Sequence, residues 1–205
     1  MFDRLKVGKI VKETEGTISI YFDIPNDLRG KYSFKAGQYL TIKANIAEEE
    51  IRRSYSISTA PHAASPAVSI KRIHGGRMSN YLHDQLTAGQ LLDILPPEGR
   101  FTVLPDAALA RDHYFFAAGS GITPLLSMIT SVLDKESENT CHLLYGNRDE
   151  ESIIFKSKLE KKSIRNLLQA SVIVDNQGNV IDTVFSSNEN AIRKNRKTAR
   201  VFYIP

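Results

Sequence analysis

Short runs of alternating hydrophobic and polar residues occupy the first half of the chain, with turn-forming residues between them. The runs are Lys6–Lys12, Thr17–Asp23, Tyr39–Ala44, Arg53–Ser58, Val68–Ile73, Leu91–Leu95 and Phe101–Leu104. Short strands at this spacing are typical of an antiparallel barrel or sandwich. One helix is predicted at Ser79–Leu86, where Ser79 can serve as the N-cap.

The pattern changes after Pro105–Asp112. An almost entirely apolar strand, a glycine-rich turn and an apolar helix follow one another, and further strands alternate with polar segments. The expected elements are a strand at His113–Ala118, a helix at Pro124–Leu133, a strand at Cys141–Tyr145, a helix from Glu151 to Lys162, a strand at Ala170–Val174 and a turn at Asn176–Gly178. Apolar strands that alternate with helices indicate a parallel sheet covered on both faces. We therefore expect two domains, residues 1–107 and 108–205.

Composition and charge narrow the class of protein. The chain has 205 residues and a net charge of +4, and its basic residues are spread out except for a cluster between Arg193 and Arg200. Such a cluster is typical of a solvated tail or helix face, so we expect no nucleic-acid partner. No apolar run approaches the ~20 residues that a membrane-spanning helix needs, and the N-terminus has no signal-peptide pattern. A cytoplasmic protein without a membrane partner is expected.

Cysteine content limits the metal chemistry. Cys141 is the single cysteine of the sequence. Iron–sulfur clusters take four cysteine ligands, or two cysteines with two histidines. We therefore expect neither an iron–sulfur cluster nor another metal site in this chain.

The strand Arg53–Ser58 carries the first candidate site. If side chains alternate, Arg53, Tyr55 and Ile57 share one face, whereas Ser54, Ser56 and Ser58 share the other. An arginine fork suits phosphate, a tyrosine ring can stack on another ring, and a serine hydroxyl can hydrogen-bond a heterocyclic nitrogen. An edge strand with a polar face explains this hexapeptide equally well.

Two glycine motifs lie next to predicted helices. Gly75-Gly76-Arg77-Met78-Ser79 opens the helix of the first half, where free backbone N–H groups attract phosphate. A plain glycine turn is the alternative. Gly119-Ser120-Gly121-Ile122-Thr123-Pro124 follows a strand and opens a helix, the context that a dinucleotide-binding loop requires. It departs from the full G-x-G-x-x-G pattern, because Pro124 stands where the third glycine would be.

Gly146-Asn147-Arg148 follows the next strand. The carboxyl ends of parallel strands form the edge at which open α/β sheets bind ligands. Arg148 is therefore a candidate for the adenosine end of a nucleotide, although a single loop arginine is more often a surface residue.

These motifs, in this order, resemble the ferredoxin–NADP⁺ reductase superfamily. Phe34–Leu40 upstream and Pro97–Phe101 between the domains complete the series. Four short sequences are similar to those of the reductase subunits of phenylacetyl-CoA epoxidases, which act in phenylacetate degradation. They are Arg-Arg-Ser-Tyr-Ser-Ile-Ser, Gly-Gly-Arg-Met-Ser, Ala-Ala-Gly-Ser-Gly-Ile-Thr-Pro and Tyr-Gly-Asn-Arg. The likeness covers residues 1 to about 160. It implies an N-terminal Greek-key flavin-binding barrel followed by a parallel-sheet nucleotide-binding domain.

The resemblance also implies roles for individual residues. Arg53 would bind the flavin diphosphate, Tyr55 would pack on the flavin ring, and Ser56 would lie near its N5 atom, which makes Tyr55 and Ser56 the candidate catalytic residues. The remaining implied cofactor contacts are Lys71 and Ile73 beside the flavin, Gly76, Met78 and Ser79 at its pyrophosphate, and Gly119, Ser120, Gly121, Thr123 and Arg148 at the nicotinamide nucleotide. The pyrophosphate segment favours FAD over FMN.

The implied activity is electron transfer. NADPH or NADH would reduce the flavin, which would pass electrons to an iron–sulfur protein or an oxygenase component on another chain. Relatives continue past this length with a Cys-Gly-Pro segment and an iron–sulfur domain. Val201–Ile204 resembles the strand before Cys-Gly-Pro, but Gln169–Thr198 follows no family pattern. We therefore expect a nucleotide domain shortened after about residue 168, and the alternative function is an FAD-binding fragment with little turnover.

Overall fold

The computed structural model describes residues 1–106, 108, 111–135, 140–163, 168–172, 183–185 and 199–203, with side chains up to Lys161. The predicted turn at Asn176–Gly178 and the basic residues from Arg193 to Lys197 lie outside these ranges. None of the described helices combines the length and the apolar character needed to span a bilayer.

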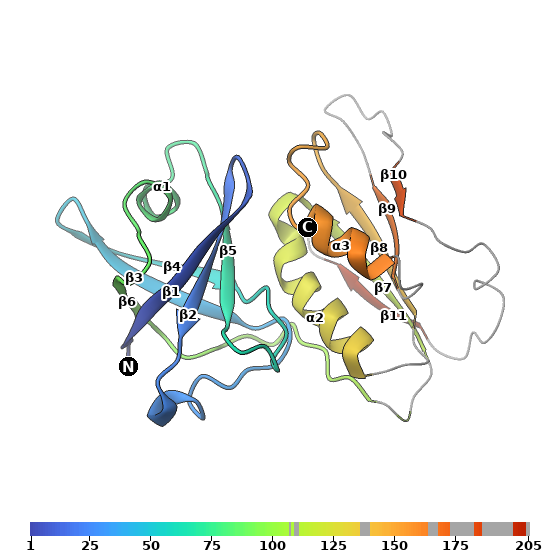
Figure 1. Cartoon of the computed structure of the whole chain (residues 1–205), viewed down its shortest axis with the longest axis horizontal. Helices are drawn as coiled ribbons and strands as arrows, with labels where there is room; N and C mark the ends of the chain where they lie inside the picture. The colour runs from blue at the N-terminus through green and yellow to red at the C-terminus, as the bar shows by residue number, and fades with distance from the viewer. Residues whose placement is uncertain are drawn as a thin grey trace.

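The first half of the chain forms one antiparallel six-stranded sheet, drawn on the left of Figure 1 in blue to green. Its strand order is β4-β3-β6-β1-β2-β5. The bounds are β1 Asp3–Thr14, β2 Thr17–Asp23, β3 Tyr39–Ile46, β4 Glu49–Ser56, β5 Ala67–Lys71 and β6 Leu91–Ile94, with a short 3-10 helix η1 at Asn26–Leu28. The expected antiparallel barrel is confirmed.

The predicted strand at Phe101–Leu104 is wrong. This segment is irregular in the structure, and the Val103 N–H donates a 3.2 Å hydrogen bond to the Ala36 carbonyl of the barrel. Val103 is buried, whereas Phe101 and Leu104 are exposed. One inward-pointing residue anchors the segment without building a ladder.

Helix α1, Arg77–Asp84, begins earlier than the sequence pattern predicts. Its N-cap is Gly76, not Ser79. The Ser79 hydroxyl instead accepts the Ile73 N–H at 3.2 Å and donates to the Gly76 carbonyl at 3.3 Å. Ser79 therefore closes the loop that precedes the helix, which is a different use of the same hydroxyl.

The barrel core is formed by apolar side chains that alternate with polar ones along the strands. Leu5, Val7, Ile20 and Phe22 of β1 and β2 are fully buried, and Leu82 of α1 is buried with them. Burial of such side chains contributes about 1.5–3 kcal/mol each. This core fixes the strands on which the candidate residues stand.

The second half forms a five-stranded sheet of order β10-β9-β8-β7-β11, drawn on the right of Figure 1. The elements are β7 Asp112–Ala118, a 3-10 turn η2 Gly119–Gly121, α2 Ile122–Lys135, β8 Thr140–Gly146, α3 Lys156–Ser163, β9 Leu168–Val172, β10 Thr183–Phe185 and β11 Ala199–Tyr203. Strands β11, β7, β8 and β9 are parallel, and β10 is antiparallel to β9. The parallel α/β arrangement predicted from the sequence is confirmed.

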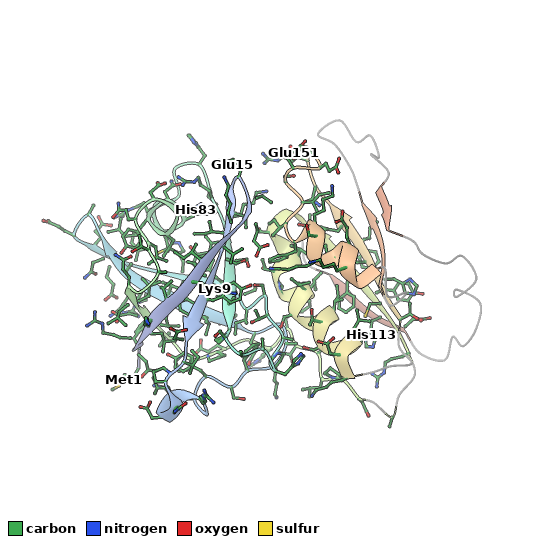
Figure 2. The ribbon with its side chains drawn as sticks, in the orientation of Figure 1. Met1, Lys9, Glu15, His83, His113 and Glu151 are labelled. Atoms are coloured by element: carbon green, nitrogen blue, oxygen red, sulfur yellow. The ribbon has the colours of Figure 1, made fainter. Side chains whose placement is uncertain are left out.

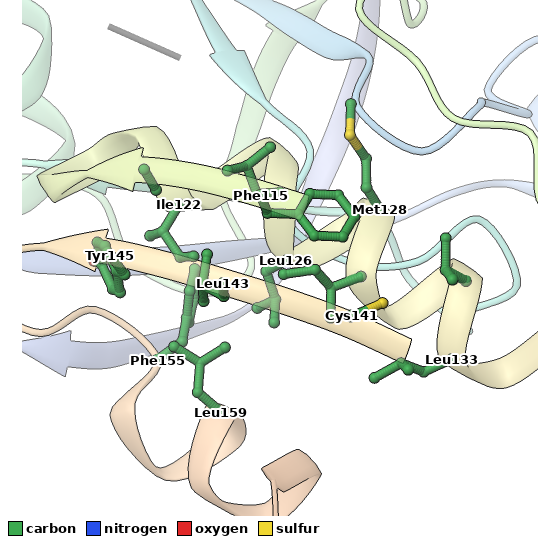
Figure 3. Close-up of a cluster of buried hydrophobic side chains, with 14 of the residues drawn as sticks. Phe115, Ile122, Leu126, Met128, Leu133, Cys141, Leu143, Tyr145, Phe155 and Leu159 are labelled. Atoms are coloured by element: carbon green, nitrogen blue, oxygen red, sulfur yellow. The ribbon is translucent and has the colours of Figure 1, made fainter. Parts of the chain in front are cut away.

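Helices α2 and α3 pack on the same face of this sheet. Phe115, Leu143 and Tyr145 point from β7 and β8 into one cluster with Leu126 of α2 and Leu159 of α3 (Figure 3). On the opposite face Leu144 is 50% exposed. The described residues place no helix there, so a sheet covered on both faces is not what this part of the chain shows.

The barrel and the α/β unit are in contact through α2, which lies between β5 and the second sheet (Figure 1). The Ser127 hydroxyl donates to the Thr59 carbonyl at 2.6 Å, and His62 Nε2 lies 3.0 Å from Asp134 Oδ2. Gly37 has φ +100, and a Cβ there would overlap the Phe101 carbonyl oxygen. Only glycine fits at this point of the interface.

Candidate functional site

Four structural elements that carry predicted site residues contact one another. Strand β5 contacts β4 on one side and the η2 turn on the other, and α1 contacts β3 and β4. The residues predicted on β4, on β5, at the start of α1 and in the glycine loop of the second half are therefore brought to one region. This region spans the junction of the barrel and the α/β unit.

Strand β4 sets the directions of its candidate side chains through its pairing with β3. Arg53 lies opposite Ile42, Tyr55 opposite Leu40, and Ser56 opposite Tyr39. Leu40 and Ile42 are fully buried, so Tyr55 stands on the core side and packs against the barrel core, whereas Arg53 is exposed beyond it. The Arg53 guanidinium donates to the Arg52 carbonyl at 2.7 Å and leaves its other N–H groups toward solvent.

Tyr55 stays protonated through the physiological range. Burial raises the pKa of its phenol to about 12, and the nearby Arg53 charge lowers it by a smaller amount. A neutral, half-buried ring next to an exposed guanidinium offers a planar surface beside a cation. This combination suits a ring system that carries a phosphate group.

The N-terminus of α1 forms a tight cradle. A Cβ at Gly76 would lie 2.6 Å from Ser79 Oγ and 3.1 Å from the Ile73 carbonyl oxygen, so a side chain there would displace the loop. The first N–H groups of a helix lack intrahelical partners and point toward a bound anion. Met78 and Ser79 are buried, whereas Ile73 is 64% exposed beside the cradle. The residues present fit a phosphate-bearing ligand with an apolar part.

The glycine loop of the second half is held by two hydrogen bonds. Gly119 has φ +48, a conformation that L side chains rarely adopt. The Thr123 hydroxyl donates to the Ser120 carbonyl at 3.0 Å, which fixes the start of α2. The Tyr145 hydroxyl donates to the Gly119 carbonyl at 2.9 Å. Burial raises the pKa of Tyr145 well above its ordinary value, so this donor stays protonated.

Lys71 joins the barrel side to this loop. A Cβ at Gly119 would lie 3.6 Å from Lys71 Nζ. Among the residues that the structure describes, no ion pair involves Lys71. A cation at a glycine loop that opens a helix adds positive charge where a phosphate would approach.

The loop Gly146-Asn147-Arg148 lies beside the glycine loop. In the parallel pairing, Gly146 is opposite Ala118, the residue before Gly119. Asn147 is 8% exposed, and its Oδ1 has no hydrogen-bond partner in the described structure. Arg148 is exposed. Both loops therefore stand at the carboxyl edge of the sheet, where ligands bind in open α/β folds.

Two residues of this region were not predicted to be part of the site. Tyr145 ends the predicted apolar strand Cys141–Tyr145, and a phenol directly before a glycine at a strand end is a usable signal for a hydrogen-bond donor. Arg77 forms an ion pair with Glu49 and donates at 2.7 Å to the Ile46 carbonyl. It thereby ties the start of α1 to the β3–β4 hairpin, a contact that sequence spacing cannot show.

A cavity of about 270 Å³ opens elsewhere on the interface. Phe34, Pro61, Leu104 and Lys135 are among its lining residues. Lys135 ends α2, whereas the glycine loop precedes its start, and a helix of 14 residues separates them by about 20 Å. This cavity is not the site that the motifs define.

Two family models match the chain. The model described as "Oxidoreductase FAD-binding domain" matches residues 4–103, and "Oxidoreductase NAD-binding domain" matches residues 115–183. A component of the 1,2-phenylacetyl-CoA epoxidase of Escherichia coli is 39% identical over 77% of this chain and 44% of its own length. The ferredoxin reductase component of the 3-ketosteroid-9-alpha-monooxygenase of Rhodococcus rhodochrous is 40% identical over 76% of this chain and 44% of its own length. The chain thus spans less than half the length of these curated relatives.

Solved structures show the same fold. The flavohemoglobin of Malassezia yamatoensis, with bound FAD and heme, superposes with a TM-score of 0.77 at 20% identity over 98% of this chain and 52% of its own. A ferredoxin NADP⁺ reductase of Neisseria gonorrhoeae, with bound FAD and NADP, gives a TM-score of 0.69 at 24% identity over 87% of this chain and 70% of its own. The chain belongs to the family of FAD- and NAD-binding oxidoreductases related to ferredoxin–NADP⁺ reductase.

Proposed function

We propose that this chain is an NAD(P)H-dependent reductase module that passes electrons through FAD to an iron–sulfur centre or an oxygenase component. In this proposal residues 1–107 bind FAD and residues 108–205 bind the nicotinamide nucleotide. The observation that carries the proposal is the contact of β5 with the η2 turn. It brings a strand of the FAD-binding half against the glycine loop of the NAD-binding half.

In this proposal, different residues of the barrel bind different parts of FAD. Arg53, exposed on β4, pairs with the diphosphate, and the N–H groups at the start of α1 bind it from the other side. Gly76 keeps that approach open, while buried Met78 and Ser79 fix the helix start. Tyr55 packs its ring on the flavin, and Lys71 and Ile73 line the edge of the flavin on β5 and beyond it. A diphosphate cradle of this kind favours FAD over FMN.

The α/β residues hold the nicotinamide nucleotide. Gly119 and Gly121 allow the backbone to approach the pyrophosphate, and the Thr123 hydroxyl fixes Ser120 in the loop. Arg148, at the carboxyl end of β8, meets the adenosine side. Lys71 reaches the same loop from the barrel and offsets the pyrophosphate charge.

When bound, the flavin supplies an acceptor for a hydride from the nicotinamide ring. The chain itself supplies position and hydrogen bonds. Ser56 follows Tyr55 on β4, and its hydroxyl is the donor that we assign to flavin N5. Tyr55 remains neutral because burial raises its pKa to about 12, so it contributes ring packing and not proton transfer.

The electron acceptor is a separate protein in this proposal. The two curated relatives described above are named as parts of multicomponent oxygenases, an epoxidase and a monooxygenase. The likeness supports an oxygenase partner of the phenylacetyl-CoA epoxidase type.

An anaerobic titration of the purified, FAD-loaded chain tests the proposal. NADH or NADPH should bleach the flavin absorbance between about 350 and 700 nm. Flavin retained but bleached by neither nucleotide would contradict reductase activity and leave only flavin binding. Arg53→Ala should separately lower the flavin content. An unchanged flavin content would contradict the assignment of the diphosphate to Arg53.

A further inference from the structure

A continuous line of hydrogen bonds crosses from the α/β unit into the barrel. Lys158 Nζ of α3 donates to Glu13 Oε1 of β1 at 2.7 Å, and the Ser19 hydroxyl donates to the same oxygen at 2.7 Å. Ser19 Oγ lies 2.7 Å from Ser69 Oγ, and Ser69 Oγ lies 2.8 Å from Ser58 Oγ. We call these five side chains the interdomain polar chain. Figure 2 labels Glu15, just after β1, and Glu151, which precedes α3, on facing sides of the interface.

The serine hydroxyls of the interdomain polar chain donate in one consistent direction, toward Glu13. Each serine has a single proton to donate. Because Ser19 donates to the Glu13 carboxylate, Ser69 must donate to Ser19, and the single Ser58 proton is shared between Ser69 Oγ at 2.8 Å and the Ala67 carbonyl oxygen at 3.3 Å. Hydrogen bonds aligned in this way strengthen one another in a poorly solvated region. The Glu13 charge therefore orients dipoles as far as Ser58, two residues beyond Ser56.

The side chains of the interdomain polar chain on the barrel are buried more deeply than polar groups usually are. Ser19, Ser58 and Ser69 are between 1% and 5% exposed, and the Glu13 side chain is 7% exposed. Buried hydroxyls and carboxylates are stable only when they are paired. An interface that served packing alone would use apolar side chains here, as the neighbouring residues Val68 and Ile70 do in the barrel core.

Lys158 is held in place by its own helix start. Phe155 has φ +66 although it is not glycine, and its carbonyl accepts the N–H groups of Lys158 and Leu159 at 2.9 Å each. Its buried ring lies 4.6 Å from Lys158 Nζ. A bulky residue in the left-handed region is strained, and such strain persists only where the surrounding structure enforces it. The strained Phe155 aims the lysine at the barrel.

The interdomain polar chain lies beside the proposed electron-transfer junction. Ser69 and Lys71 lie on the same face of β5, since side chains two residues apart point the same way. Lys71 is the residue that reaches Gly119. The hydrogen bonds thus connect α3 to the strand that contacts the glycine loop.

We propose that Glu13 and Lys158 are positioning residues, which act through the serine hydroxyls to hold the nucleotide-binding unit in register with the flavin-binding face. This inference rests on the proposed function. Without the Lys158 cation, the buried Glu13 carboxylate loses its charge partner and the two units acquire alternative relative positions. Hydride transfer depends steeply on the separation of donor and acceptor, so misplacement by about 1 Å is enough to lower its rate.

A distance measurement tests the structural part without turnover. Ala88 and Lys161 are exposed on the barrel and on α3, and Cys141 is buried, so spin labels on Ala88→Cys and Lys161→Cys report the separation of the two units. Pulsed EPR should give one narrow distance distribution in the labelled parent. Lys158→Met and the isosteric Glu13→Gln should each broaden or shift it. The control Lys156→Met removes a cation that pairs with Glu150 and Glu160 of its own unit, and it should not.

Stopped-flow reduction of the FAD-loaded protein tests the functional part. At saturating NAD(P)H we expect the reduction rate constant to fall roughly tenfold in Lys158→Met, with flavin content unchanged and the nucleotide Kd changed less than about twofold. Lys158→Arg should restore most of the rate, because it keeps the charge.

The outcomes separate the two proposals. A parent that binds flavin but is not reduced contradicts the proposed function, while the EPR comparison still decides the inference. Unchanged distance distributions in both variants, or a reduction rate in Lys158→Met equal to that of Lys156→Met, overturn the role of Glu13 and Lys158.

Discussion

The Tyr145 hydroxyl donates a 2.9 Å hydrogen bond to the carbonyl oxygen of Gly119, so that β8 holds the turn that follows β7. The bond is partly buried, and burial raises the pKa of its phenol donor above the ordinary value. The turn is therefore held by the neighbouring strand as well as by its own backbone.

Tyr145→Phe removes this bond and keeps the ring in the core. A hydrogen bond of this kind contributes about 0.5–1.5 kcal/mol, so we expect the Kd for the nicotinamide nucleotide to rise about fivefold while FAD content stays constant. Equilibrium titration of the nucleotide into FAD-loaded protein measures this Kd. Tyr114→Phe, on the opposite face of the sheet, is the matched control. Equal affinities in the two variants would show that the turn does not need this bond.

Gly76→Ala places a methyl group 2.6 Å from Ser79 Oγ and 3.1 Å from the Ile73 carbonyl oxygen. Relief of this overlap moves the start of α1 and costs about 1–3 kcal/mol, so FAD retention should weaken at least about fivefold. The flavin absorbance per protein after dialysis measures the effect. Gly30→Ala, where a Cβ meets nothing within 4 Å, should keep its flavin. Full flavin content in Gly76→Ala would exclude the α1 cradle as the diphosphate site.

Ser127→Ala tests the contact between α2 and the barrel. The hydroxyl is fully buried and donates to the Thr59 carbonyl at 2.6 Å, and its loss leaves a carbonyl without that donor. We expect a loss of about 1 kcal/mol, or a Tm lower by ~2–4 °C. Differential scanning calorimetry measures it, with Ser157→Ala on the exposed side of α3 as the control. Identical Tm values would mean that the interface is held by its apolar contacts alone.

The ion pair of Arg72 with Asp84 predicts a pH effect at the acid end. Arg72 donates to both carboxylate oxygens of Asp84, at 3.0 and 2.5 Å, and this interaction lowers the pKa of Asp84 below its ordinary value of 3.8. A depressed pKa in the folded state means that the stabilisation is present above about pH 4 and is lost as pH falls through the folded-state pKa. Asp84→Asn should therefore lower Tm slightly at pH 7 and flatten the decline of Tm below pH 4. Parallel Tm profiles for parent and variant would contradict this assignment.

Most strands were predictable because burial follows the two-residue period of each strand. The bounds of β2, Thr17–Asp23, agree with the prediction. Strand β4 begins at Glu49 and not at Arg53, because its first half lies in a polar hairpin with β3 that has no apolar alternation to detect. Strand β10, Thr183–Phe185, lies in a stretch without a recognisable pattern and was not predicted.

The candidate site was predictable in its motifs and not in its connections. Glycine loops can be recognised in the sequence because they need particular backbone conformations at fixed places in a strand–loop–helix unit. The contacts of Lys71 with the Gly119 loop and of Glu13 with Lys158 join residues 48 and 145 positions apart in the sequence. Only the packing of the two units creates such contacts, so no local pattern encodes them.

The pairing of β11 with β7 has a consequence for how the protein is made. Val201 lies opposite Tyr114 in this parallel ladder, so one edge of β7 waits for a strand that is synthesised 87 residues later (201 − 114). At about 5–20 residues per second, the ribosome adds the intervening residues in roughly 4–17 s. The barrel strands, all within the first hundred residues, can pair during that interval. Nascent chains would then carry a folded barrel beside a sheet with an open edge, which is a state that a chaperone can recognise.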